Sequence, residues 1–211
     1  MPLPVDPERA LSLAYAPAPA RAALSALWRL DEQLGASIVR TETPAVAQMR
    51  LVWWHDALKT LCTDRPVDPI LVTLAEAPGI DPEALLPLID GWEVLLEPLP
   101  LSEEALATYA GARGGTLFGV VATLLGGDAD ASEQAGRGWA LADLAFRISD
   151  RVTAERALAL AGSASHGRLP KPLAILAALA RRDVRRGLNR PRRQGSPMRV
   201  ARAMVAGLTG L

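Results

Sequence analysis

The sequence predicts an all-α protein, a bundle of helices around one hydrophobic core. Half of its 211 residues are hydrophobic but only 4% are aromatic, and Ala, Leu and Arg dominate the rest. These residues favour helices, and no alternating run of β-branched residues of any length is present to favour a strand. The length suits one domain, or a domain with a short appendage, that can bury a sizeable core.

The sequence also restricts the cellular compartment in which we expect the protein. The single cysteine, Cys62, excludes an internal disulfide and fits a reducing compartment. The longest apolar run, residues 117–125, is far shorter than the roughly 20 residues that span a bilayer. The first ten residues carry acids and prolines, which fit neither a signal peptide nor a transit peptide. We therefore expect a soluble, cytoplasmic protein that is at most peripheral to a membrane.

Two long helices are predicted near the N-terminus. The first is expected over residues 18–39, and it begins near Pro19 because proline is favoured in the first turn of a helix. After a break at residues 41–44, the second runs to about Cys62. Asp31 lies within the apolar stripe of the first helix, which is formed by Ala23, Leu27, Leu30, Leu34 and Ile38.

The rest of the chain is predicted to be a series of helices separated by proline and glycine. The expected helices are residues 69–77, 82–96, 102–125, 132–160 with a possible break near Ser149, 173–186 and 198–208. Residues 162–172 are expected to form a loop, and 189–197 an arginine-rich linker. We divide the chain into a helical domain, 1–188, and an appendage, 189–211, made of the linker and the last short helix.

The predicted helix 102–125 has an unusual middle. Residues 111–116 include Gly111, Gly114 and Gly115. Each glycine costs a helix interior about 1 kcal/mol relative to alanine. We therefore expect another backbone, or a ligand, to approach this helix closely.

Arg50 is the most informative charged residue of the second helix. On a helical wheel it lies inside the apolar arc, beside Trp54. A buried guanidinium requires a carboxylate partner, and Asp31 on the preceding helix is placed to supply it. The pair is interpreted either as a salt bridge that fixes helix register or as part of a cation-binding site in a central cavity. The two interpretations are compatible.

The C-terminal part of the chain is strongly basic. From residue 181 onward there are nine arginines and one acid, Asp183, although the formal net charge of the whole chain is zero. A solvated helix and linker explain this pattern, and an anionic membrane surface or an acidic protein are alternatives. Nucleic acid is the least expected partner, because no aromatic residues are interleaved with these arginines.

A series of short motifs is similar to those of a known family. In chain order they are Leu27-Trp28-Arg29-Leu30-Asp31-Glu32, Arg50-Leu51-Val52-Trp53-Trp54, Tyr109-Ala110-Gly111-Ala112-Arg113-Gly114-Gly115-Thr116, Gly136-Arg137-Gly138-Trp139 and Gly167-Arg168-Leu169-Pro170. Together they resemble the squalene/phytoene synthase family over roughly residues 14–175. The resemblance implies an isoprenoid-synthase-like helical bundle that binds prenyl diphosphates in its cavity.

The resemblance also implies two aspartate-rich motifs that hold Mg²⁺, and both are incomplete here. Asp31 and Glu32 match the opening of the first motif, but Gly35 stands at its closing position. In the second motif Arg147 or Ile148 stands where the first aspartate belongs. Asp143 and Asp150 remain nearby, but seven residues apart. An arginine cannot bind Mg²⁺, so the magnesium clamp is expected to be lost.

Two functional hypotheses follow. The first is a pseudoenzyme with no resident metal or cofactor that binds a protein partner or a prenyl or other lipid ligand. The resemblance includes such a non-catalytic branch, the assembly factors of respiratory complex I. The second is an active prenyl or terpenoid transferase that uses Mg²⁺ through atypical catalytic ligands, namely Asp31, Glu32, Asp143 and Asp150. A lipid carrier with an apolar tunnel is a plainer third possibility.

The resemblance further implies candidate substrate-binding residues, which are Arg50, Trp54, Tyr109, Gly115 and Arg147. Arg147 is able to bind a phosphate group directly. The two histidines, His55 and His166, form no cluster with zinc-site spacing.

Overall fold

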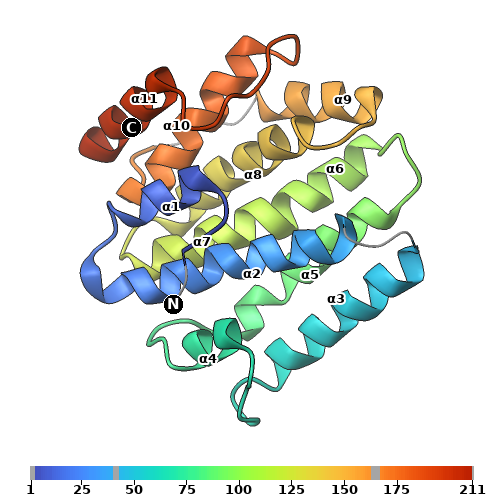
Figure 1. Ribbon diagram of the computed structural model, residues 1–211, viewed down its shortest axis with the longest axis vertical. Coiled ribbons are helices and arrows are strands. Elements are labelled where there is room, and N and C mark those ends of the chain that lie inside the picture. The colour runs from blue at the N-terminus through green and yellow to red at the C-terminus, as the bar shows by residue number, and fades with distance from the viewer. Residues whose placement is uncertain (1–2, 40–42, 163–166, 211) are drawn as a thin grey trace.

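The computed structural model describes residues 3–39, 43–162 and 167–210, and all of the regular structure in this part is helical (Figure 1). The predicted all-α, isoprenoid-synthase-like class is therefore confirmed. The α-helices are α1 (Pro7–Leu13), α2 (Arg21–Val39), α3 (Pro44–Lys59), α4 (Pro69–Ala75), α5 (Pro87–Glu93), α6 (Glu103–Tyr109), α7 (Thr116–Leu124), α8 (Ala129–Ala145), α9 (Arg151–Ala161), α10 (Lys171–Arg186) and α11 (Pro197–Thr209).

Shorter helical turns complete the chain. Three 3₁₀ turns are η1 (Ala18–Ala20), η2 (Glu83–Leu85) and η3 (Val94–Leu96), and η4 (Ala110–Gly115) is a π-helical segment between α6 and α7. Parts of the predicted break at 41–44 and of the predicted loop at 162–172, including His166, lie outside the described residues. Among the described residues, no helix is both long and apolar enough to cross a membrane.

The predicted helices are present, and the possible break near Ser149 is confirmed, because Asp150 caps a new helix, α9, by accepting a hydrogen bond from Thr153 N at 2.7 Å. Three details differ. The predicted helix 82–96 is divided into η2, α5 and η3. The predicted helix 102–125 is continuous but contains the π-helical turn η4. Helix α1 was not predicted; it begins at an N-cap, Asp6, whose side chain accepts hydrogen bonds from the amides of Glu8 and Arg9.

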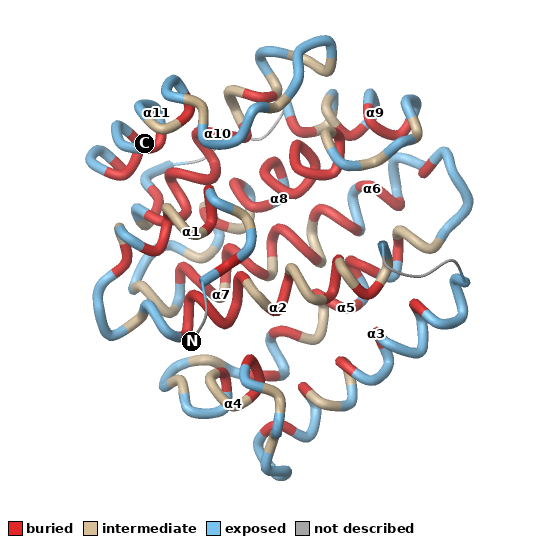
Figure 2. The backbone as a smooth tube through the Cα atoms, viewed as in Figure 1, coloured by how far each residue is buried: buried red, intermediate tan, exposed pale blue. Residues whose placement is uncertain are grey.

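The core lies between α2, α7, α8 and α10, whose facing sides are buried (Figure 2). Trp28, Phe118 and Trp139 pack together there, with ring centroids 5.2 to 6.5 Å apart. Trp54 and Trp92 are also buried, whereas Trp53 is 53% exposed. Most of the tryptophans are therefore core residues, as expected, with Trp53 as the exception.

The glycine-rich segment crosses α8 at very short range. A Cβ at Gly114 would lie 2.1 Å from Gly136 O, and a Cβ at Gly136 would lie 2.0 Å from Gly114 O. Only glycine permits this approach at both positions. The expectation that another backbone comes close to residues 111–116 is confirmed.

Candidate functional site

Asp31 lies at the centre of the molecule and is completely buried. Its carboxylate accepts hydrogen bonds at 2.9 and 2.8 Å from Nε and Nη2 of Arg113, which binds it side-on with two parallel contacts. Arg9 Nη2 donates to the same carboxylate at 2.6 Å, and Trp92 Nε1 donates at 2.8 Å. Asp31 is thus held by two arginines and an indole.

Arg113 joins Asp31 to Asp143. Its Nη2 also donates to Asp143 Oδ2 at 3.1 Å, so one guanidinium bridges the two aspartates. Arg9, Asp31, Arg113 and Asp143 are all buried, and we call them the central ion cluster. Arg113 reaches this position from η4, where the close crossing with α8 brings the two helices together.

Aromatic rings enclose the Arg113 guanidinium. Its central carbon lies 4.3 Å from the ring centroid of Trp92 and 4.8 Å from that of Trp139. Arg113 Nη1 donates to the hydroxyl of Tyr109. Burial raises the pKa of Tyr109 to about 12 although the charge of Arg113 opposes this, so the phenol stays protonated at neutral pH.

The C-terminal arginines extend the ion network toward the surface. Arg192 Nη1 donates to Asp143 Oδ1 at 2.8 Å, and Arg192 Nη2 lies 3.5 Å from Glu8 Oε2. Arg199 donates to both oxygens of Glu8, at 2.5 and 2.8 Å, and also to Asp183. Arg192 and Arg199 are therefore largely buried and ion-paired. The interpretation of the basic C-terminal part as a solvated helix and linker does not hold for these two residues.

The buried charges of the network balance. Four acids face four arginines that are buried or nearly so, and these are Glu8, Asp31, Asp143 and Asp183 against Arg9, Arg113, Arg192 and Arg199. Each carboxylate already has a cationic partner. Such a set carries no excess negative charge with which to attract a divalent cation.

Burial and charge act in opposite directions on the two aspartates. Burial would raise the pKa of Asp31, but the charges of Arg113 and Arg9 and the hydrogen bonds from Arg113 and Trp92 lower it to about 2. Burial opposes ionisation of Asp143 as well, and Arg113, Arg147 and Arg192 hold its pKa well below the usual value. Both carboxylates are ionised at neutral pH.

The predicted pairing of Asp31 with Arg50 is wrong. Arg50 is exposed, and the carboxylate of Asp31 is bound by Arg9 and Arg113 instead. The helical wheel failed because α3 lies at the edge of the molecule (Figure 1) and buries only a narrow stripe, formed by Ala47, Leu51, Trp54 and Leu58. Arg50 lies outside this stripe, on the exposed side.

The four candidate catalytic acids do not form one group. Asp31 and Asp143 meet at Arg113, as described above. The Glu32 carboxylate instead accepts hydrogen bonds from Val5 N and Asp6 N, at 2.9 and 3.0 Å, and so anchors the N-terminal segment. Asp150 caps α9.

The candidate substrate-binding residues are also dispersed. Both Trp54 and Arg50 belong to α3, where Trp54 is buried and Arg50 is exposed. Tyr109 contacts Arg113 within the core, and Gly115 is buried at the end of η4. Arg147 is half-exposed, donates to Asp143 Oδ1 at 2.8 Å and lies 3.1 Å from Asp6, so its charge is already engaged by two carboxylates.

The donor set does not fit Mg²⁺. Across the described residues, no group of three or more His, Cys, Asp or Glu side chains is arranged to hold a metal ion. The position that closes the first motif, Gly35, is packed against an indole, and a Cβ there would lie 2.8 Å from Trp92 Cη2. Glycine at residue 35 thus makes room for the ring that donates to Asp31.

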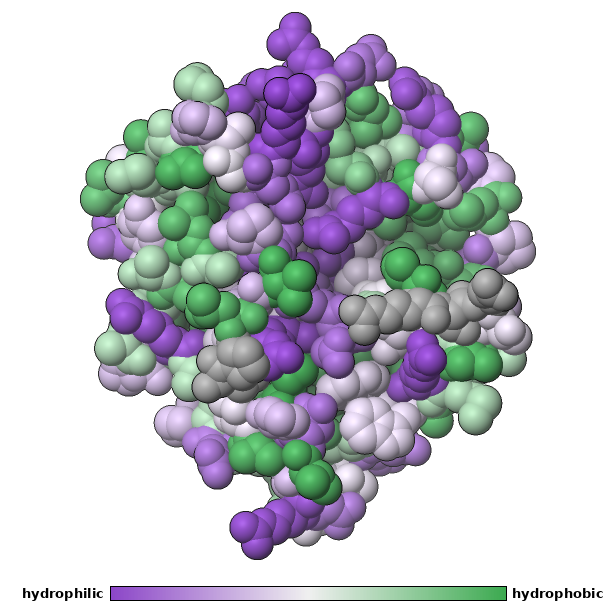
Figure 3. Space-filling view, viewed as in Figure 1, coloured by the Kyte–Doolittle hydropathy of each residue, from purple (hydrophilic) through white to green (hydrophobic). Residues whose placement is uncertain are grey.

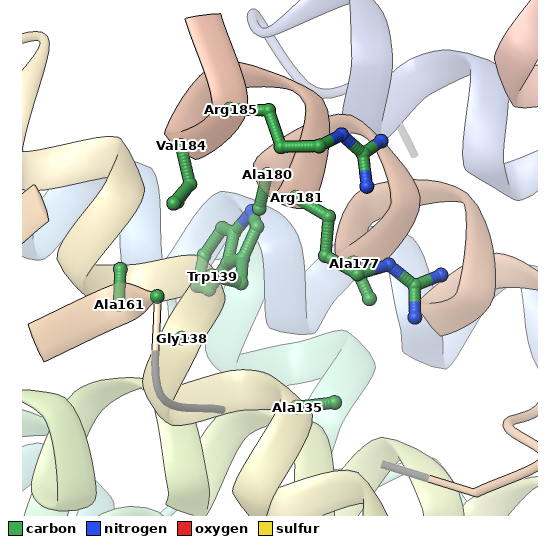
Figure 4. A pocket seen from close by; sticks show the side chains of 10 residues that line it. Ala135, Gly138, Trp139, Ala161, Ala177, Ala180, Arg181, Val184 and Arg185 are labelled. Atoms are coloured by element: carbon green, nitrogen blue, oxygen red, sulfur yellow. The ribbon is translucent and has the colours of Figure 1, made fainter. Parts of the chain in front are cut away.

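The cavities near the site are small. The one that reaches Asp143 and Arg9 has a volume of about 10 Å³, no more than a water molecule requires. A larger cavity of about 170 Å³ lies between α8, α9 and α10 (Figure 4), where Trp139 and Ala177 line it and Arg181 and Arg185 extend away from Trp139. Neither Asp31 nor Asp143 lines this second cavity.

Comparison with known proteins identifies the family of the chain. Residues 4–187 match the family model described as squalene/phytoene synthase, which is most of the chain. The chain belongs to the squalene/phytoene synthase family. Searches of curated proteins and of solved structures returned no significant match. In this chain the buried carboxylates of Asp31 and Asp143 are joined by the guanidinium of Arg113.

None of the observed partners of Asp31 and Asp143 was predicted from the sequence. Arg113 lies inside a quoted motif, but nothing in its spacing distinguishes a buried arginine from an exposed one. Arg9 lies in α1, which was not predicted, and Trp92 comes from α5. The signal that could have found Arg113 is its position between glycines, because a helix face that packs against another backbone is buried.

Proposed function

We propose that this chain is a non-catalytic member of the squalene/phytoene synthase family that acts as a binding or assembly protein. The observation that carries this proposal is the bridge from Arg113 to Asp31 and Asp143. A prenyl synthase of this family needs both motifs free to hold Mg²⁺ and a diphosphate. Here the carboxylates of Asp31 and Asp143 are each paired with arginines.

Two further features support the proposal. The 10 Å³ cavity beside Asp143 is too small for any diphosphate. Trp92 and Tyr109 fill the space around the Arg113 guanidinium, so opening a cavity would expose a buried ion network. Such a rearrangement would leave charged groups without partners and cost several kcal/mol.

Catalysis is tested by following pyrophosphate release from prenyl diphosphates of several chain lengths in the presence of Mg²⁺. An active squalene or phytoene synthase serves as the positive control. We expect no release above the level of the protein-free buffer. Release that requires Mg²⁺ and falls on substitution of Glu32→Gln or Asp150→Asn would instead establish the transferase with atypical ligands.

The assembly role is tested separately in the native cell. We propose that the chain assists a respiratory complex of the complex I type, as the resemblance to its assembly factors implies. Deletion of the gene should lower the amount of assembled complex on a native gel while other respiratory complexes remain unchanged. The wild-type chain and Glu32→Gln should both restore it. An unchanged level of the complex would contradict this role.

A further inference from the structure

The last helix, α11, has its large apolar residues on the outside. The side of α11 that packs against α10 is formed by small residues, Ala203, Ala206 and Gly207, together with the ion-paired Arg199. The large apolar side chains point outward and are between 50% and 73% exposed, namely Met198, Met204, Val205 and Leu208. We call these four residues the α11 outer face. A helix that only covered the core would show the opposite pattern.

This orientation is fixed by the packing beneath. A Cβ at Gly207 would lie 2.4 Å from the ring of Tyr15, so α11 lies directly on the N-terminal segment. Arg199 binds Glu8 and Asp183 on the same buried side. Rotation of α11 to bury its large residues would break these ion pairs, so the outer face stays outside.

Arginines flank the outer face. Arg202 lies beside Met198 and Val205 on the helix surface, and its Nε donates to Ala178 O of α10 at 3.4 Å. Burial, followed by the charges of Arg185 and Arg182 on α10, lowers the pKa of Arg202. Arg202 thus places a positive charge next to the apolar α11 outer face.

The region of α11 is mixed in hydropathy on the surface. At the upper left of Figure 3, over the place that α11 takes in Figure 1, green apolar side chains lie among paler and hydrophilic ones. At the C-terminal end of α11, Leu169 N donates to Gly210 O at 3.2 Å, which brings the neighbouring Arg168 to the same edge.

We propose that the α11 outer face docks on the surface of an anionic lipid bilayer. Met198, Met204, Val205 and Leu208 enter the boundary between headgroups and acyl chains, and Arg182, Arg185 and Arg202 contact lipid phosphates. An apolar helix face with arginines along its flank has the two properties that peripheral membrane helices combine. The inference does not depend on whether the chain is catalytic.

The positive charge beside the α11 outer face favours an anionic bilayer, and not a second copy of the chain, as its binding partner. A symmetric dimer through α11 would place the same patch opposite itself and bring the two sets of arginines together. Like charges across an interface are unfavourable. An anionic bilayer offers the opposite charge and an apolar layer at the depth that the outer face requires.

The experiment is co-sedimentation of the full chain with vesicles of phosphatidylcholine, with and without phosphatidylglycerol. We expect binding to the anionic vesicles and little to phosphatidylcholine alone. Met204→Asp with Leu208→Asp should lower the partition coefficient roughly tenfold or more, because two apolar contacts become charged. Arg185→Gln with Arg202→Gln should lower it by a similar factor, and only at low salt.

A matched control lies on α3, where Met49 and Val52 are also exposed. Met49→Asp with Val52→Asp makes the same chemical change away from α11 and should leave binding unchanged. Circular dichroism and thermal unfolding establish that each variant is folded. The proposal is overturned if the wild-type chain does not sediment with anionic vesicles, or if the α3 and α11 variants lose binding equally. It is also overturned if the chain is a dimer that Met204→Asp with Leu208→Asp converts to monomers.

Discussion

At the residue scale, one guanidinium holds two buried carboxylates together. Arg113 is always charged, planar and able to bind Asp31 through two parallel hydrogen bonds while reaching Asp143. Arg9 adds a second positive charge on Asp31. Because two arginines carry the charge of one dication, the buried carboxylates are neutralised without a metal.

Removing that guanidinium should be costly. Arg113→Met leaves Asp31 and Asp143 short of a cation in the core, and we expect the free energy of unfolding to fall by about 3–5 kcal/mol. Urea denaturation monitored by circular dichroism measures this loss. The control is Arg151→Met, which removes an exposed pair with Glu155 and should cost less than about 1 kcal/mol. If both substitutions cost the same, the central ion cluster does not hold the fold together.

Asp31 makes stability depend on pH in one direction. Its pKa is about 2 in the folded chain, below the ordinary value of 3.8, so its ionised form stabilises the fold above that ordinary value. This contribution, about 2 kcal/mol, should disappear as pH falls from about 4 toward 2. Asp143 adds to the loss in the same sense.

Urea unfolding measured at a series of pH values tests this dependence. The free energy of unfolding should be nearly constant between neutral pH and about pH 5 and then decrease steeply. Asp31→Asn should show a shallower decrease, because one of the titrating carboxylates is gone. A free energy that stays constant down to about pH 3 would contradict the assigned ion pairs.

At the element scale, the crossing of η4 and α8 positions Arg113. Gly114 and Gly136 face each other with backbone atoms in contact, and Arg113 precedes Gly114 in the chain. A methyl group at residue 114 has no flexible side chain to displace, because its nearest atom would be a backbone oxygen. The methyl group would push η4 and α8 apart, which would weaken the contacts of Arg113 with Asp31 and Asp143.

Gly114→Ala should therefore lower the free energy of unfolding by about 3 kcal/mol through overpacking. Thermal unfolding of the variant gives the comparison. Gly167→Ala is the matched control, because no atom lies within 4 Å of a Cβ at that position. The close crossing would be disproved by equal stability of the two variants.

The elements were more predictable than the contacts between them. Apolar periodicity and proline positions located most helices, including α2 and α10, because these signals are local. The burial of Asp31 was predicted correctly from its place in the α2 stripe. Its partner was not, since Arg9 and Arg113 are 22 and 82 residues away in the chain, and pairing at that range depends on tertiary packing.

The error at Arg50 has a related cause. A helical wheel shows which residues share a face, but not how wide a stripe the neighbouring helices will cover. A central helix such as α10 buries a broad arc, whereas α3 at the periphery buries about one residue per turn. The width of the buried stripe depends on the whole bundle and could not be read from one segment.

At the scale of the whole molecule, α1 and the C-terminal segment meet beside the central ion cluster. Glu8 of α1 pairs with Arg192 and Arg199, and Arg192 also reaches Asp143. Residues 189–211, predicted as an appendage, thereby contribute two cations to the buried network. The central claim is that arginines, and not metal ions, hold Asp31 and Asp143.

The most direct test is a crystal structure after soaking with Mn²⁺, whose anomalous scattering identifies it, and a non-reactive prenyl diphosphate analogue. We expect no anomalous peak between Asp31 and Asp143, with Arg113 within hydrogen-bonding distance of both carboxylates. A manganese ion bound by these two aspartates, with the Arg113 guanidinium displaced and the analogue's diphosphate on the metal, would contradict the account.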